Sequence, residues 1–279
     1  MEVRSLALAG ASPIAVAEAG AGGRPLVLVH GFTGAKEDFT DWLDPLAALG
    51  WHAVAPDLRG HGDSAKPGDE AAYSLAAFAA DLFGLFDVLG WSSAVALGHS
   101  MGGMVLQTAA LAAPARFDAI VLMDTSHRAV AADPEVIELA VVLARAEGMP
   151  ALLAVQEALD GDGPLANDID RRLKAERPGY KEFGDRKMLA SSPAMYAAMI
   201  AAITDRSGDH DRLEQLQSLT MPALVLVGEH DRPFLGPSKR MADALPFGEL
   251  AVIPGAAHSP QFESPEPWWD ALRAFLARV

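Results

Sequence analysis

Short aliphatic runs alternate with amphipathic segments along most of this 279-residue chain. Runs of this kind predict β-strands at residues 14–18, 26–29, 52–55, 94–97, 120–123, 223–227 and 249–253. The runs at 52–55, 94–97 and 120–123 are almost uniformly aliphatic, which is typical of strands buried on both faces. Apolar residues at helical spacing predict helices at 39–49, 75–89, 101–113, near 238–244 and at 267–277. The alternation indicates an α/β fold with a doubly wound, mostly parallel sheet covered by helices.

Residues 126–217 break this alternation. Glycines and prolines there separate five predicted helices, at 134–147, 151–159, 169–176, 180–189 and 194–203. We therefore predict a core domain formed by residues 1–125 and 218–279, with an all-helical cap, or lid, inserted at residues 126–217. The methionines of this insertion either shape an adaptable pocket or pack the cap onto the core. They are Met149, Met188, Met195 and Met199.

The segment Gly98-His99-Ser100-Met101-Gly102-Gly103 lies between a predicted strand and a predicted helix. A Gly-x-Ser-x-Gly turn at such a junction lifts its serine into a cleft, which makes Ser100 a candidate nucleophile. The flanking glycines allow the strand and the helix to pack closely around it. The backbone N–H of Met101 then faces an oxyanion that forms when Ser100 attacks a carbonyl. The alternative interpretation is a glycine-rich turn without chemistry.

Three further loops follow predicted strands and carry the groups that such a serine needs. Asp231 lies in the loop after 223–227, and His258 lies in the loop after 249–253. The order Ser, Asp, His is the one expected for a nucleophile elbow on this sheet, with His258 as general base and Asp231 orienting it. The loop after 26–29 offers the backbone N–H of Phe32 as a second oxyanion donor. Each loop taken alone is also compatible with a plain turn.

Several rival residues need an interpretation beside these. Asp124 also ends a predicted strand; we prefer Asp231 as the catalytic acid and expect Asp124 to cap the next segment through Thr125 and Ser126. His30 is expected to brace the loop that holds Phe32. His99 is expected to be buried and hydrogen-bonded, and His127, at the start of the insertion, is expected at the surface. His61 is expected to be structural.

Together, these loops resemble those of the α/β-hydrolase superfamily, and the resemblance extends over essentially the whole chain. Residues 57–64, Asp-Leu-Arg-Gly-His-Gly-Asp-Ser, match a loop that is common after the family's fourth strand. The resemblance implies an eight-stranded, mostly parallel sheet with a helical cap. The elbow is similar to those of esterases, cofactor-free haloperoxidases and lactonases. Haloalkane dehalogenases and epoxide hydrolases carry Asp where this chain has Ser100, so the resemblance disfavours their chemistry.

Composition and charge narrow the functional classes further. The net charge of −15 argues against a nucleic-acid partner, because phosphate binding needs clustered Lys and Arg. The sequence has no Cys, no His-rich metal spacing and no apolar run of the ~18–20 residues that span a bilayer. Residues 1–4 do not look like a signal peptide. We expect a cytoplasmic protein without metal, cofactor or membrane contact, either a monomer or a small homo-oligomer.

The leading functional hypothesis is a cofactor-independent serine hydrolase that cleaves small carboxylic esters or lactones through an acyl-enzyme on Ser100. One alternative is a C–C bond hydrolase of ring-cleavage products, or a lyase that resembles the cyclohexadiene-carboxylate synthase of menaquinone synthesis. Those enzymes need a carboxylate-binding Arg in the cleft. Another alternative is a non-catalytic ligand-binding protein with a hydrolase fold.

Overall fold

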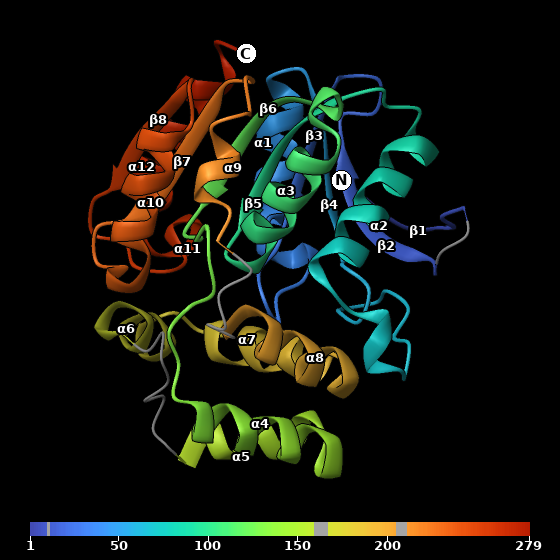
Figure 1. The fold of residues 1–279 in the computed structure, drawn as a ribbon, viewed down its shortest axis with the longest axis vertical. Coiled ribbons are helices and arrows are strands. Elements are labelled where there is room, and N and C mark those ends of the chain that lie inside the picture. Colours follow the sequence, from blue (N-terminus) through green and yellow to red (C-terminus); the bar gives the residue numbers. More distant parts are fainter. Residues whose placement is uncertain (10–11, 159–166, 205–210) are drawn as a thin grey trace.

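A central eight-stranded sheet organises the computed structural model, which describes residues 1–9, 12–158, 167–204 and 211–279 (Figure 1). The strand order is β1-β2-β4-β3-β5-β6-β7-β8, and this confirms the predicted fold class. β1 and β2 join the sheet in antiparallel fashion, and every other pairing is parallel. The strands are Glu2–Leu6, Ile14–Ala19, Arg24–Val29, Trp51–Pro56, Ala94–His99, Phe117–Met123, Ala223–Gly228 and Gly248–Ile253.

Among the strands of the described residues, β1 is the one that the residue pattern did not predict. Four of its five residues are exposed, since it is an edge strand that pairs with β2 alone. An edge strand of this kind has no aliphatic run, and its segment is as polar as a loop. The central strands are buried along their whole length, as their uniform aliphatic composition predicts.

Helices cover both faces of the sheet. On one face, α1 (Thr40–Ala48) and α12 (Pro265–Leu276) pack against residues such as Leu26 and Leu28 of β3. On the other face, α2 (Leu75–Leu89), α3 (Met101–Ala112) and α10 (Arg232–Ala244) contribute to a core that contains the alternate residues Val27 and Val29. Successive side chains of a strand point to opposite faces of the sheet, so alternate residues of each central strand pack into two different hydrophobic cores.

Five further helices lie together beyond the carboxyl ends of the parallel strands (Figure 1). They have a small core of their own, which includes Ala144, Met149, Leu152 and Ala197. These helices agree closely with the prediction, although its residue Leu159 lies outside the described residues. The division into core and cap at residues 126 and 217 stays a prediction. The helices are α4 (Pro134–Glu147), α5 (Met149–Ala158), α6 (Asp168–Glu176), α7 (Tyr180–Leu189) and α8 (Pro193–Thr204).

Short or interrupted helices were the main errors in the helix prediction. α10 begins at Arg232, six residues before its predicted start, and carries Pro237 inside it. Gly236 and Pro237 hide the first turns of this helix from a pattern that treats both as helix breakers. The one-turn helices α9 (Leu213–Leu216) and α11 (Pro260–Glu263) are too short to show a period. In the described part of the chain, no helix has both the length and the apolar content that a bilayer span requires.

A buried ion pair fixes the loops that follow β3 and β4. Asp57, after β4, accepts hydrogen bonds from the backbone N–H of Lys36 at 2.7 Å and from Lys36 Nζ at 2.9 Å. Both side chains are almost fully buried, whereas Asp63, the third partner, is 76% exposed. Burial lowers the pKa of Lys36, but hydrogen bonds to Asp57, Asp63 and Glu37 outweigh it and hold that pKa above its usual value. The ammonium group is therefore charged and depends on Asp57 for compensation.

The substitution Asp57→Ala is predicted to lower the free energy of unfolding by about 3–5 kcal/mol, because it leaves the buried Lys36 ammonium without its main partner. Asp63→Ala is the matched control, since it removes an exposed partner of the same ammonium and should cost below about 1 kcal/mol. Urea unfolding followed by circular dichroism measures both variants. Equal losses in the two variants would contradict the role given to Asp57.

Candidate active site

Ser100 lies on a strained turn between β5 and α3. Its backbone has φ +52° and ψ −117°, in the half of conformational space that non-glycine residues rarely adopt. Such a conformation costs on the order of 1–3 kcal/mol and needs support from its surroundings. The support comes from the adjacent strand β6: the Ser100 N–H donates to Met123 O at 2.9 Å, and Thr125 Oγ1 donates to Ser100 O at 2.6 Å. The side chain is thereby held clear of the strand.

The glycines of this turn are required by close backbone packing. A Cβ atom on Gly98 would lie 2.5 Å from the carbonyl oxygen of Gly102. A Cβ atom on Gly102 would lie 2.4 Å from the carbonyl oxygen of Val29 in β3. Contacts this short do not occur, so no larger residue fits at either position. The absence of side chains lets the first turn of α3 lie directly against the sheet and brings Ser100 toward the loop after β3.

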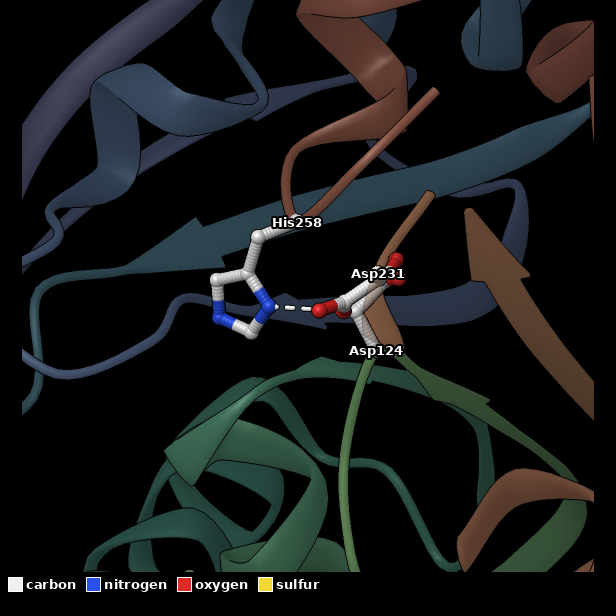
Figure 2. A group of neighbouring side chains, drawn as sticks. All are labelled: Asp124, Asp231 and His258. Atoms are coloured by element: carbon white, nitrogen blue, oxygen red, sulfur yellow. Dashed lines mark hydrogen bonds and ion pairs between the residues drawn. The ribbon is translucent and has the colours of Figure 1, made fainter. Parts of the chain in front are cut away.

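The structure brings Ser100, His258 and Asp231 together in one hydrogen-bonded chain. His258 Nε2 lies 3.0 Å from Ser100 Oγ, and His258 Nδ1 lies 2.8 Å from Asp231 Oδ2 (Figure 2 shows the latter pair). Because the carboxylate only accepts, Nδ1 carries the proton and Nε2 is free to accept the Ser100 hydroxyl proton. His258 lies in the loop between β8 and α11, and Asp231 lies at the start of α10.

The loop that carries His258 is held from both sides. Glu263 Oε2 accepts hydrogen bonds from the backbone N–H of Ala257 at 2.5 Å and of Ser259 at 3.2 Å. His99 Nε2 donates to the carbonyl oxygen of His258 at 2.7 Å, which confirms the expectation that His99 is buried and hydrogen-bonded. Burial, with the nearby His258, lowers the pKa of His99 to about 3, so this ring is neutral. Glu263 could not be predicted from the sequence, because nothing in the local pattern links a helix-end carboxylate to these amides.

Asp124 lies directly behind the Asp231 carboxylate, and the expectation that it caps the following segment is wrong. Its Oδ1 accepts a hydrogen bond from the N–H of Gly228 at 2.8 Å, across to the end of β7. Its Oδ2 accepts no hydrogen bond from the described residues, and it can pair with the Asp231 carboxylate only by donating a proton of its own. Asp124, Asp231 and His258 each offer one atom within 4.8 Å of the others (Figure 2). Burial and the neighbouring negative charge of Asp231 raise the pKa of Asp124 well above its ordinary value.

The loop after β3 brings its backbone close to Ser100. A Cβ atom on Gly31 would lie 3.1 Å from Ser100 Cβ, so the next residue, Phe32, borders the same space. Among the described residues, neither the Phe32 N–H nor the Met101 N–H has an intramolecular acceptor. For Met101 the reason is its place as the first residue of α3, where helical amides have no partner. Both amides are therefore available to a ligand beside Ser100 Oγ.

His30 braces this loop, as predicted. Its Nδ1 donates to the carbonyl oxygen of Gly31 at 2.8 Å, and its Nε2 accepts from the N–H of Leu58 at 3.0 Å. The ring is fully buried, and burial lowers the pKa of His30, so the neutral form that can both donate and accept is favoured. His61, also buried, stacks edge-on against His30 at 4.8 Å between ring centroids and has the structural role expected of it.

A cavity of about 310 Å³ opens between these loops and the helices α5, α6 and α7. Its core side carries Phe32, Ser100 and His258, and its helical side carries apolar residues such as Leu153, Phe183 and Met188. Met188 is the only one of the four methionines considered above that lines it; Met149, Met195 and Met199 are buried in hydrophobic cores. The helical insertion therefore supplies one wall of the cavity in front of Ser100.

Charged groups in the cavity wall compensate one another. Lys187 pairs with Asp38, Lys174 with Asp170 at 2.6 Å, and Lys181 with Asp185 at 2.7 Å. Each of these lysines is therefore paired with an aspartate. No arginine is among the described residues that line the cavity.

His127 does not lie at the surface, which corrects the expectation for this residue. Its side chain is 1% exposed; Nδ1 donates to Asp211 at 2.7 Å, and Nε2 accepts from Arg240 at 3.1 Å. Asp211 is the first described residue after the segment 205–210, and Arg240 belongs to α10 of the core. His127 thus joins the two connections of the helical insertion to the core. The sequence pattern could not predict that His127 is buried, because its two hydrogen-bond partners are 84 and 113 residues away in the sequence.

Comparison with known proteins agrees with this architecture. Residues 24–265 match a protein family described as the alpha/beta hydrolase fold. A 2-(acetamidomethylene)succinate hydrolase of Mesorhizobium japonicum is 31% identical over 267 residues, which cover 94% of this chain and 90% of the relative. A putative 2-succinyl-6-hydroxy-2,4-cyclohexadiene-1-carboxylate synthase of Bacillus subtilis is 26% identical over 91% of this chain and 90% of the relative. Epoxide hydrolase A of Mycobacterium tuberculosis is 29% identical over 94% of this chain and 93% of the relative.

Solved structures share the fold over its whole length. An enol-lactonase from Burkholderia xenovorans LB400 superposes with a TM-score of 0.82 at 23% identity, covering 98% of this chain and all of the other. A thermophilic esterase from Thermogutta terrifontis superposes with a TM-score of 0.80 at 28% identity, covering 100% of this chain and 99% of the other. These relatives catalyse different reactions, so the fold alone does not identify the reaction of this chain.

The buried acid Asp124 gives a prediction for the pH dependence of stability. Its folded pKa lies above the unfolded value of about 3.9, so between these two pKa values the folded state holds a proton that the unfolded state has lost. Asp124 therefore reduces stability with rising pH, by up to about 1.4 kcal/mol per pH unit, until the pH passes its folded pKa. The Asn side chain of Asp124→Asn cannot titrate. The free energy of unfolding of this variant minus that of wild type should therefore increase between about pH 5 and pH 8.

Urea unfolding of both proteins across this pH range measures the difference. Asp118→Asn is the control, because it removes an exposed carboxylate from the same strand, β6, and should show no such trend. A difference between Asp124→Asn and wild type that is independent of pH would contradict a protonated Asp124.

Proposed function

This chain belongs to the α/β hydrolase fold family, and on that premise we propose that it is a cofactor-independent serine hydrolase of small carboxylic esters or lactones. The observation that carries the proposal is the hydrogen-bonded chain from Ser100 through His258 to Asp231. A serine hydroxyl is a weak nucleophile at neutral pH and needs a base within reach. The arrangement supplies that base and the carboxylate that orients it.

The proposed reaction begins with attack of Ser100 Oγ on the substrate carbonyl. His258 Nε2 takes the hydroxyl proton, and Asp231 stabilises the imidazolium that results. The negative charge on the carbonyl oxygen is stabilised by the N–H groups of Phe32 and Met101, and removing one such donor typically costs about 3–4 kcal/mol. Collapse of the tetrahedral intermediate breaks the carbon–oxygen bond, and His258 returns its proton to the leaving alcohol. An acyl ester on Ser100 remains.

In the second half of the proposed reaction, water hydrolyses the acyl ester on Ser100. His258 removes a proton from water, the hydroxide attacks the acyl ester, and the proton returns to Ser100 Oγ as the acid leaves. A lactone follows the same steps, except that its leaving hydroxyl stays attached to the acyl chain. The product in that case is a hydroxy acid.

The likeness to an epoxide hydrolase does not extend to this chemistry. A carboxylate nucleophile opens an epoxide to an ester, which water can hydrolyse. A serine oxygen would open it to an ether, which His258 and water cannot cleave, so the enzyme would be consumed in one turnover. Ser100 in the nucleophile position therefore favours carbonyl substrates.

The cavity also bears on the alternative of a C–C hydrolase or lyase with acidic substrates. That reaction class needs a cationic group for the substrate carboxylate, and the described cavity wall has no arginine. The lysines Lys174, Lys181 and Lys187 are each paired with an aspartate. An anionic substrate would have to displace one of these carboxylates, whereas a neutral ester or lactone would not. The cavity therefore favours neutral substrates.

We propose that residues 126–217 act as a lid over this cavity. Lys187 of α7 pairs with Asp38, which follows the loop that carries Phe32. Phe32 itself contacts Tyr196 of α8, with ring centroids 4.9 Å apart. These contacts support a lid that rests on the oxyanion loop and shields the reacting carbonyl from water.

Ser100→Ala is predicted to abolish hydrolysis of p-nitrophenyl butyrate and to prevent labelling by a fluorophosphonate probe, because both require the Ser100 oxygen. Asp231→Asn should reduce kcat about 10⁴-fold, since the wrong imidazole tautomer is then favoured. Ser92→Ala, at an exposed serine outside the site, is the control and should match wild type. Wild-type protein that neither turns over esters nor takes up the probe would support a non-catalytic binding protein instead.

Glu263 gives a second prediction about the same machinery. Glu263→Ala leaves the N–H groups of Ala257 and Ser259 without their acceptor and lets the His258 loop shift. We expect kcat to fall by about tenfold to a hundredfold with little change in KM, because a shift of roughly 1 Å in a catalytic group has effects of this size. Glu263→Gln keeps one acceptor oxygen and should recover most of kcat. Steady-state kinetics of the two variants test this, and identical losses in both would contradict it.

A further inference from the structure

Gln261 is a buried polar residue that the mechanism above does not use. It lies in α11, three residues after His258, and is only 2% exposed. Both polar atoms of its side chain, Nε2 and Oε1, have no hydrogen-bond partner among the described residues. Buried amides without partners are rare in folded proteins and destabilise them. Gln261 also forms part of the cavity wall beside His258 and Ser259, so its partner is expected on the cavity side.

A second group without a partner borders the same cavity. His99 Nδ1 is buried and accepts no hydrogen bond from the described residues. Its Nε2 carries the proton that is donated to His258 O, so Nδ1 has a free lone pair. This atom lies 3.3 Å from the position that a Cβ on Gly31 would take. The missing side chain of Gly31 keeps the space beside Nδ1 open toward Ser100.

The hydrogen-bonding capacity of these atoms defines the group that would satisfy them. Gln261 offers one amide donor group and one acceptor, and His99 Nδ1 offers a second acceptor. A ligand that can donate is needed, and a hydroxyl both donates and accepts. A carboxylate only accepts, so it would leave Oε1 and Nδ1 unsatisfied.

The position of Gln261 decides which part of the substrate it reaches. In the reaction proposed above, His258 delivers its proton to the leaving oxygen, so the alcohol part of an ester lies on the His258 side of the carbonyl. Gln261 follows His258 by three residues and lines the same cavity. A side chain there contacts the alcohol part of the substrate rather than the acyl part.

We propose that Gln261 is a specificity-determining residue that hydrogen-bonds a hydroxyl group on the alcohol part of the substrate. The substrate class is then monoesters of diols or polyols, together with lactones that carry a free hydroxyl near the ring oxygen. This inference rests on the proposed ester hydrolysis and adds to it the chemical identity of the leaving group. It assigns the buried amide a partner that plain alkyl esters lack.

The test compares two esters that share an acyl chain and have nearly the same shape. Propyl butanoate and 2-hydroxyethyl butanoate differ by one methyl-to-hydroxyl exchange at the end of the alcohol. Wild type is expected to show a kcat/KM ratio, hydroxyethyl over propyl, that is about threefold to tenfold higher than the ratio of Gln261→Leu. Gln261→Met, which keeps the unbranched shape, should lose the preference to the same extent. Ser92→Ala, at an exposed serine outside the cavity, is the control and should keep the wild-type ratio.

The outcomes separate this inference from the proposed function. Probe labelling of Ser100 and turnover of propyl butanoate, with equal ratios in wild type and both Gln261 variants, would overturn the role of Gln261 and leave the serine hydrolase intact. A Gln261-dependent preference for propyl 3-hydroxybutanoate, which carries its hydroxyl on the acyl part, would overturn its placement on the leaving-group side. Loss of both labelling and turnover in wild type would instead reject the hydrolase itself.

The thermal stability of the Gln261 variants gives a readout that needs no substrate. If the buried amide has no partner within the protein, Gln261→Leu should melt about 2 °C higher than wild type, since an apolar side chain is better suited to a buried site without partners. A melting temperature that falls in both Gln261→Leu and Gln261→Met would show that the amide has a structural partner. That result would overturn the inference.

Discussion

The position of one imidazole ring, that of His258, decides what the rest of this structure can do. The ring must reach a hydroxyl on the turn after β5 and a carboxylate on the turn after β7, while its own loop follows β8. These segments are far apart in the sequence. They meet because β3 to β8 run parallel, so that their carboxyl ends lie at one edge of the sheet. The parallel sheet is therefore the physical basis of the site.

The strained backbone of the molecule is concentrated at this edge. Among the described residues, the non-glycine residues with positive φ are Thr33, Ser100 and Asp124, and each lies just beyond a strand that borders the site. Such conformations persist only where the surroundings fix them. Here the fixing contacts are backbone hydrogen bonds to β6 and β7 and the close packing that Gly98 and Gly102 allow. The two hydrophobic cores thus stabilise a turn that is unfavourable on its own.

Local patterns predicted the fold and most of the helix and strand positions, because strands buried on both faces are aliphatic and helices show a period. They also placed Ser100 and His258, since the elbow and the loop after a strand are short-range features. Contacts between distant segments could not be predicted in this way. Asp124 meets Gly228 only because β6 and β7 are neighbours, and His127 is buried only because the chain returns beside it. The unsatisfied amide of Gln261 is likewise a property of the assembled cavity.

The central claim is that Ser100 carries the acyl group during turnover. The most direct measurement is rapid-quench mass spectrometry of wild-type protein mixed with p-nitrophenyl butyrate, followed by peptide mapping. We predict a transient butanoyl group on the peptide that contains Ser100, formed as p-nitrophenol is released and lost as butyrate appears. Sustained turnover without any acylated peptide, or with the acyl group on a different residue, would contradict the account.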